Sequence, residues 1–195
     1  MLYNTAVKAS GNLANNINRI LDNEFKDERF IVFQHDICKG VDYRFRICDA
    51  IHSEIAWRAG YNKFTDNTIA KDTTFNEYLD GIVNTCRDLR IPSFIVCGKA
   101  MIKRMEPDKV IPIKYTFHNC DAYYAIYNYD RNLDGVFDEY SGRNWVASNF
   151  NCILDPCCGY GIIANDIIAH NKRGVLSDIN VECLEYINNN YMVKE

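Results

Sequence analysis

The sequence is poor in proline and lacks the features of secreted and membrane proteins. It has four prolines in 195 residues and never two in succession. No apolar run approaches the about 18 residues of a membrane-spanning helix. The first residues also lack the charged-then-apolar layout of a signal peptide. We therefore expect a cytoplasmic protein with no membrane partner.

The nine cysteines include no Cys-x-x-Cys pair, which disfavours a zinc site. Their number is odd, and several stand inside apolar runs such as SFIVC (93–97) and NCILD (151–155). Cysteine in such a run behaves as a small buried hydrophobe. We therefore predict reduced core thiols, with neither a disulfide framework nor a metal site.

The net charge of the chain bears on whether its surface could bind nucleic acid broadly. The formal net charge is -4, with 48% hydrophobic and 25% charged residues. This balance disfavours a broadly basic coat for nucleic acid, although a local basic face is compatible with it. The length suits one domain with one good core.

Apolar patterns alternate between those of strands and those of helices. Continuous apolar runs predict buried strands at 29–33, 91–99, 151–155 and 173–178. Helical spacing predicts helices over 5–25, 46–59, 73–90, 160–171 and 180–192. Two aromatic runs, 109–119 and 121–130, predict an antiparallel hairpin, and 130–144 reads as a polar connection. Alternating strands and helices indicate an α/β layered sheet.

A glycine turn follows the predicted strand at 151–155. The strand ends at Asp155-Pro156, Gly159 and Gly161 flank Tyr160, and a helical pattern begins directly afterwards. Glycines let the backbone approach a ligand closely, and the amides at a helix N-terminus favour polar or anionic groups. The next strand ends at Asp178, where an acid can accept hydrogen bonds from a ribose. The pattern predicts a cradle for a small molecule.

This turn resembles the first motif of the class I S-adenosylmethionine-dependent methyltransferases. The likeness is strongest to the DNA methyltransferases that modify the amino group of adenine, whose motif reads Asp-Pro-x-Cys-Gly-x-Gly. The matching residues are Asp155, Pro156, Cys157, Cys158, Gly159, Tyr160 and Gly161. Asp178 matches the acid of the family's second strand.

The resemblance implies a fold, a cofactor and residue roles. The fold would be a single Rossmann-like sheet with helices on both faces and an antiparallel hairpin, and the cofactor S-adenosylmethionine. Asp155, Gly159 and Gly161 would line the methionyl side of the cofactor. Asp178 would bind the ribose, with Ile179 beside the adenine ring.

The late position of the motif resembles the circularly permuted members of the family. In that order the catalytic and substrate half, 1–145, precedes the cofactor half, 146–195, within one domain. The predicted strand at 29–33 would then stand in the place of the catalytic strand.

The Asp/Asn/Ser-Pro-Pro-aromatic motif of those enzymes is missing, because the chain has no Pro-Pro. That motif holds a flipped base. Gln34, His35 and Asp36 follow the first strand and could bond a substrate instead, with His35 and Asp36 as a general base. We name these three as catalytic candidates. The alternative is a polar strand end with a cap at Asp36.

Several other interpretations stay open at this stage. GYGIIA (159–164) also fits the G-x-G-x-x-A dinucleotide pattern, and a tight turn without a ligand would look alike. The stretch 130–141 resembles a calcium loop but reads more simply as a turn at Asp134-Gly135. The function expected is a methyltransferase acting on DNA or another nucleic acid. The alternative is a catalytically lapsed binding protein that works through nucleic acid or a protein partner supplying the missing elements.

Overall fold

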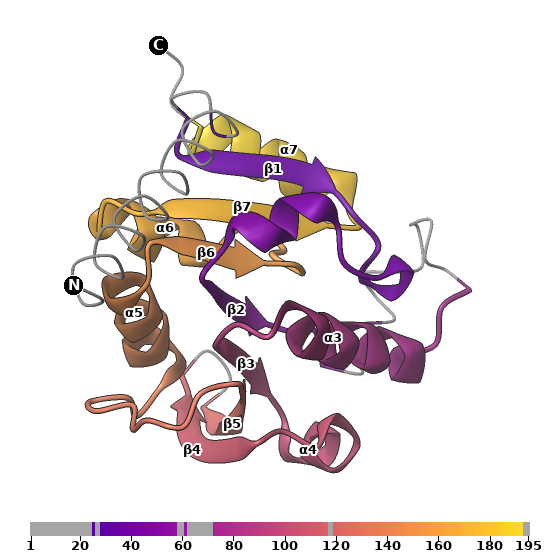
Figure 1. The fold of residues 1–195 in the computed structure, drawn as a ribbon, viewed down its shortest axis with the longest axis vertical. Coiled ribbons are helices and arrows are strands. Elements are labelled where there is room, and N and C mark those ends of the chain that lie inside the picture. The colour runs from indigo at the N-terminus through magenta and orange to yellow at the C-terminus, as the bar shows by residue number, and fades with distance from the viewer. Residues whose placement is uncertain (1–24, 26–27, 58–60, 62–71, 117–118, 193–195) are drawn as a thin grey trace, which may run out of the picture.

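One seven-stranded sheet forms the centre of the molecule (Figure 1). The computed structural model describes residues 25, 28–57, 61, 72–116 and 119–192. The strands are β1 (Phe30–Gln34), β2 (Ala50–Glu54), β3 (Ser93–Cys97), β4 (Lys109–Tyr115), β5 (Cys120–Tyr127), β6 (Cys152–Asp155) and β7 (Arg173–Asp178). They are ordered β1-β7-β6-β2-β3-β5-β4. The helix predicted over 5–25 lies outside the described residues, apart from Phe25.

The pairing of the strands confirms the predicted fold class. Strands β1, β7, β6, β2 and β3 are parallel, whereas β5 runs antiparallel to both β3 and β4. The aromatic hairpin therefore closes one side of the sheet, as predicted. Strand β6, which precedes the glycine turn, is sixth in the chain but central in the sheet. This is the permuted order that the sequence indicated.

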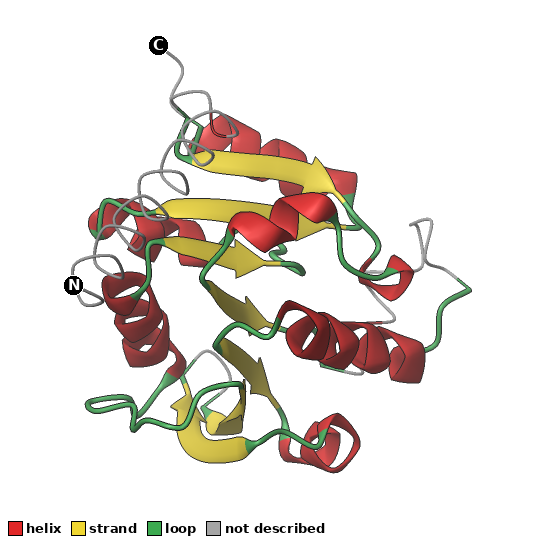
Figure 2. Cartoon of the chain, viewed as in Figure 1, coloured by secondary structure: helices red, strands yellow, loops and turns green. Residues whose placement is uncertain are grey.

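Helices cover both faces of the sheet (Figure 2). They are α3 (Phe75–Leu89), α4 (Lys99–Met105), α5 (Glu139–Asn149), α6 (Ile163–Ala169) and α7 (Val181–Asn190), with 3-10 turns η1 (Ile37–Lys39) and η2 (Tyr43–Ile47). Thr74 and Glu77 form a capping box at the N-terminus of α3. No helix in the described ranges combines the length and the apolar character that crossing a bilayer requires.

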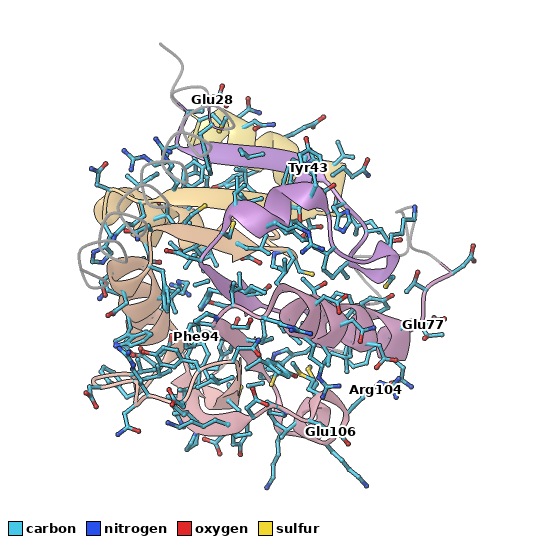
Figure 3. All side chains as sticks on the ribbon, in the orientation of Figure 1. Glu28, Tyr43, Glu77, Phe94, Arg104 and Glu106 are labelled. Carbon is cyan, nitrogen blue, oxygen red and sulfur yellow. The ribbon has the colours of Figure 1, made fainter. Side chains whose placement is uncertain are left out.

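Each face of the sheet carries its own hydrophobic cluster. On one face, Ile51 and Leu154 pack with residues of α3 and α4, such as Ile82. On the other, Ile153 packs with residues of α5, α6 and α7. Phe94, labelled in Figure 3, belongs to this second cluster and contacts the rings of Tyr129, Trp145 and Phe150. All nine cysteines are free thiols, and most are buried.

The helix predicted over 46–59 is wrong, because this stretch holds strand β2. Residues 50–53 are fully buried between both clusters. Its buried positions include the polar residues His52 and Ser53, so β2 shows neither the continuous apolar run nor the alternation that marks a strand in sequence.

The polar connection predicted over 130–144 is also wrong in its second half. Helix α5 begins there, capped by Asp138, whose carboxylate accepts the backbone N–H of Ser141 at 2.7 Å. Asp138 and Ser141 thus cap a helix, and the calcium-loop likeness has this simpler explanation. Helix α4 was not predicted at all.

Strand β1, which the sequence placed in the catalytic position, lies at the edge of the sheet and is not a neighbour of β6. Strand β1 pairs with β7, and Gln34 lies in register with Asp178. The neighbour of β6 on its other side is β2. The segment that follows β2, rather than β1, therefore faces the glycine turn across the centre of the sheet.

Candidate active site

A cavity opens between the parallel strands β6 and β2, whose connections lead to opposite sides of the sheet. From β6 the chain passes through α6 to β7 on one side, whereas β2 leads through α3 to β3 on the other. Ligands of open α/β sheets bind at the carboxyl ends of the strands beside such a switch point. The cavity here has a volume of about 320 Å³. That volume lies at the lower end of the range for small-molecule sites.

Most of the residues that the sequence singled out line this one cavity. They are His35, Asp36, Asp155, Pro156, Cys157, Gly159, Asp178 and Ile179. Gln34 and Gly161 do not line it. The structure also adds lining residues from the end of β2, from α3 and from the end of β4, among them Glu54, Tyr78 and Tyr115.

The two glycines of the turn have different tasks. Both adopt a positive φ, 50° at Gly159 and 72° at Gly161, which side chains on an L-residue disfavour. A Cβ at Gly161 would stand 2.8 Å from Ile187 Cγ1, whereas a Cβ at Gly159 would meet nothing within 4 Å. Gly161 therefore lets the turn pack on α7. Gly159 leaves open space beside the cavity.

Asp178 is oriented by the glycine turn. Its Oδ2 accepts the N–H of Gly159 at 2.8 Å, and its Oδ1 accepts the N–H of Asn180 at 2.9 Å. Burial raises the pKa of Asp178, and these backbone hydrogen bonds oppose that rise. A carboxylate oxygen can accept more than one hydrogen bond, so both oxygens can still receive hydroxyls from a ligand.

Asp155 is the most deeply buried acid of the cavity, with 2% of its surface exposed. Its Oδ1 accepts the hydroxyl of Ser53 at 2.7 Å and the N–H of Cys157 at 3.2 Å. Burial raises the pKa of Asp155 to about 7, although the hydrogen bonds from Ser53 and Cys157 lower it. Both bonds go to Oδ1, which leaves Oδ2 to accept from a ligand.

The end of β2 carries an acid and an aromatic residue at the motif's spacing. Glu54-Ile55-Ala56-Trp57 places Glu54 and Trp57 where the Asp/Asn/Ser-Pro-Pro-aromatic motif has its first and fourth residues. The N–H of Ile55 donates to Val96 O at 3.4 Å, and that of Ala56 donates to Tyr78 Oη at 3.2 Å. Proline has no N–H, so these bonds fix the backbone in a way that Pro-Pro could not.

Sequence reasoning missed this segment because it predicted a helix there. The available signal was the Glu-x-x-Trp spacing after the apolar residues 50–51, read as the end of a strand. In the structure, the rings of Trp57 and Tyr115 lie 5.5 Å apart and tilted by 35°. Tyr115 Oη also donates to Glu54 Oε2 at 3.4 Å. Glu54 and Tyr115 thus line one side of the cavity, and the ring of Trp57 packs against that of Tyr115 without lining the cavity itself.

The predicted catalytic residues lie at the other side. Gln34 Nε2 donates to Ile179 O at 2.9 Å, and the N–H of His35 donates to Asp178 O at 3.0 Å. Asp36 caps η1 by accepting the N–H of Cys38 at 3.0 Å. This cap is the alternative that the sequence left open. The catalytic role of Gln34, His35 and Asp36 stays a prediction, and their position is beside the second-strand acid.

Comparisons with known proteins identify the fold. No family model matches the sequence, and no curated protein matches it either. The structure of M1.HpyAVI has 13% sequence identity and a TM-score of 0.53, with 82% of this chain and 97% of that chain covered. For the M1.HpyAVI–SAM complex the identity is 11% and the TM-score 0.51, over 82% and 98% of the two chains.

A second solved protein gives the same result. TTHA0409 from Thermus thermophilus, a candidate DNA modification methylase complexed with S-adenosyl-L-methionine, has 10% identity and a TM-score of 0.51. The match covers 82% of this chain and 93% of that chain. This chain therefore has the fold of the class I S-adenosylmethionine-dependent methyltransferases, in a form that resembles DNA methylases.

Proposed function

We propose that this chain binds S-adenosylmethionine and transfers its methyl group to an amino nitrogen, with the amino group of adenine in DNA as the leading acceptor. One observation carries this proposal. A single cavity joins Asp155 and Asp178 beside the glycine turn to Glu54 across the switch point. Solved neighbours that contain S-adenosylmethionine support the choice of cofactor.

The residues of the cavity fit the chemistry of that cofactor. Its sulfonium and ammonium groups are cationic, and the lining includes Asp36, Glu54, Asp155 and Asp178 but no lysine or arginine among the described residues. Opposite charge favours binding in a partly desolvated site. The glycine turn and Asp155 would hold the methionyl part, and Asp178 would accept the two ribose hydroxyls, with Ile179 beside the adenine ring.

The acceptor side would be formed by the segment after β2. The cofactor would supply an electrophilic methyl group, which would pass to the lone pair of the acceptor nitrogen while the C–S electron pair stays on sulfur and the N–H proton leaves to water. Glu54 would accept an N–H of the acceptor and so orient the nitrogen lone pair. Tyr115 would stack on one face of a planar ring, and Trp57 would support Tyr115 from the side away from the cavity lining. The protein would contribute position and desolvation rather than covalent chemistry.

Gln34, His35 and Asp36 take a supporting role in this proposal. Gln34 and His35 bond the backbone of Ile179 and Asp178, the two residues assigned to the ribose and adenine. They would therefore shape the cofactor end of the cavity. A general-base role for His35 is not required, because the amine loses its proton after methyl transfer.

A second candidate is a catalytically lapsed binding protein that keeps the cofactor and acts with nucleic acid or a partner subunit. Ile55-Ala56 in place of Pro-Pro favours it, as does the ion pair that already engages Glu54. Such a protein would bind S-adenosylmethionine and transfer nothing unless a partner is present.

A methyl-transfer assay separates the two candidates. Purified protein is incubated with S-adenosylmethionine carrying a tritiated methyl group and with single- and double-stranded oligonucleotides that contain adenine. The enzyme proposal predicts labelled oligonucleotide with wild type and a loss of at least about tenfold in Glu54→Gln, because the neutral amide donates as well as accepts. Cofactor binding without any transfer would favour the lapsed protein instead.

A further inference from the structure

Arg143 is a buried arginine that touches the acceptor side of the cavity without lining it. It lies on α5 with 3% of its surface exposed. Its Nη1 pairs with Glu54 Oε1, and its Nε donates to Asp166 Oδ2 of α6 at 3.1 Å. The guanidinium also stands over the ring of Tyr140, 4.6 Å from the ring centre. Glu54 is thus the link between this arginine and the cavity.

Stability alone explains such an arrangement poorly. Replacing a buried ion pair by apolar groups of similar size is often neutral or stabilising, because burying both charges is costly. Here the buried charges adjoin the cavity, and one of them, Glu54, lines it. The cation therefore acts on a carboxylate that a ligand can reach.

Several groups besides Arg143 act on the charge of Glu54. Tyr115 Oη, on β4, donates to its Oε2 at 3.4 Å. Glu139 of α5 lies close enough to disfavour its ionisation, and Glu54 in turn disfavours that of Asp155 on β6. Burial raises the pKa of Glu54, and the guanidinium of Arg143 opposes this rise most strongly.

We propose that Arg143 is a positioning residue that fixes Glu54 through Oε1 and holds it as an ionised carboxylate, leaving Oε2 to accept an N–H from the methyl acceptor. This inference rests on the proposed methyl transfer. An ionised carboxylate has no hydrogen to donate, so the site selects acceptors that carry one, such as amino groups. The same charge favours the positive charge that develops on the nitrogen as it is methylated.

The direct test measures the ionisation of Glu54. Protein with ¹³C-labelled glutamate side-chain carboxyls is titrated by NMR, and the Glu54 signal is assigned by its loss in Glu54→Gln. Arg143→Gln is expected to raise the pKa of Glu54 by roughly one unit or more, whereas Arg143→Lys keeps a cation and shifts it less. The matched control is Arg104→Gln, which removes an exposed arginine of α4 (Figure 3) and should leave Glu54 unchanged.

The methyl-transfer rate gives a second readout. With an adenine-containing single-stranded oligonucleotide as the probe, the acid limb of the rate should move to higher pH in Arg143→Gln by the same amount as the Glu54 titration. S-Adenosylmethionine affinity should stay within about threefold, which corresponds to well under 1.4 kcal/mol, because Arg143 does not line the cavity. A merely structural arginine would lower the rate at every pH without moving the limb.

Failure of this inference is distinguishable from failure of the proposed function. An unshifted Glu54 titration in folded Arg143→Gln would overturn the inference even if the protein binds cofactor and transfers methyl. If Arg143→Gln does not fold, the NMR titration of wild type tests the inference instead. A Glu54 that is protonated at pH 7.5 in wild type would overturn the inference. Absence of cofactor binding would instead refute the proposed function and leave the NMR result standing.

Discussion

The hydroxyl of Ser53 donates a 2.7 Å hydrogen bond to the carboxylate of Asp155, and both side chains are buried. Ser53 precedes Glu54 at the end of β2, and Asp155 ends β6. The two strands are parallel neighbours, with Ile51 opposite Leu154. This bond therefore joins the proposed acceptor strand to the proposed cofactor strand across the switch point.

Asp155 should make the stability of the fold depend on pH. Its pKa is about 7 in the folded protein, above the ordinary value of an unfolded aspartate, so the folded state binds more protons between the two values. Stability from this group is complete at low pH and is lost as pH rises toward 7. Between pH 5 and pH 8, wild type should lose about 2–3 kcal/mol more unfolding free energy than Asp155→Asn.

Urea unfolding of both proteins at the two pH values measures this difference. The other raised acids, Glu54 and Asp178, remain in both proteins, so the difference reports the titration of Asp155 together with its electrostatic coupling to these two carboxyls. Equal pH dependence in wild type and Asp155→Asn would contradict the assignment of a raised pKa to this carboxyl.

The two glycines of the turn should respond differently to alanine. Gly161→Ala adds a methyl group 2.8 Å from the buried Ile187, so overpacking of about 1–3 kcal/mol adds to the backbone strain. Gly159→Ala has the strain alone, about 1–2 kcal/mol, but its methyl group enters the space beside the cavity. Gly161→Ala should therefore lower the free energy of unfolding more than Gly159→Ala does. Gly159→Ala should lower the cofactor affinity, measured by calorimetry, more than Gly161→Ala does. The reverse ranking of the two variants in both measurements would contradict these separate roles.

Tyr78 should hold the segment after β2 through its hydroxyl. Removing that oxygen in Tyr78→Phe leaves the N–H of Ala56 without its acceptor and costs about 1–3 kcal/mol if water cannot replace it. Tyr43→Phe is the matched control, because Tyr43 is 67% exposed and its loss of a hydroxyl should not change stability. Equal thermal unfolding of Tyr78→Phe and wild type would show that this bond does not fix the segment.

Much of the fold could be predicted from local patterns. The glycine turn, the helix over 73–90 and the aromatic hairpin each depend on residues close together in sequence. Those predictions were confirmed because the same local chemistry operates in the folded chain. The position of the turn near the end of the chain also indicated the permuted order.

The proposed acceptor side of the cavity, at the end of β2, could not be predicted from local sequence patterns. Strand β2 is buried on both faces, which removes the alternation that marks a strand, and its neighbours in the sheet come from 93–97 and 152–155. Its place beside β6 is set by these distant pairings rather than by its own residues. For the same reason, the sequence placed β1 in the catalytic position, although β1 pairs with β7.

Calorimetric titration with S-adenosylmethionine tests the central claim most directly. It compares wild type with Asp178→Ala and with Asp121→Asn, a control in which an exposed acid of β5 is neutralised. The account predicts that wild type and Asp121→Asn bind, and that Asp178→Ala binds at least about tenfold more weakly, a loss of about 1.4 kcal/mol or more. Wild type that does not bind, or Asp178→Ala that binds as tightly as wild type, would contradict it.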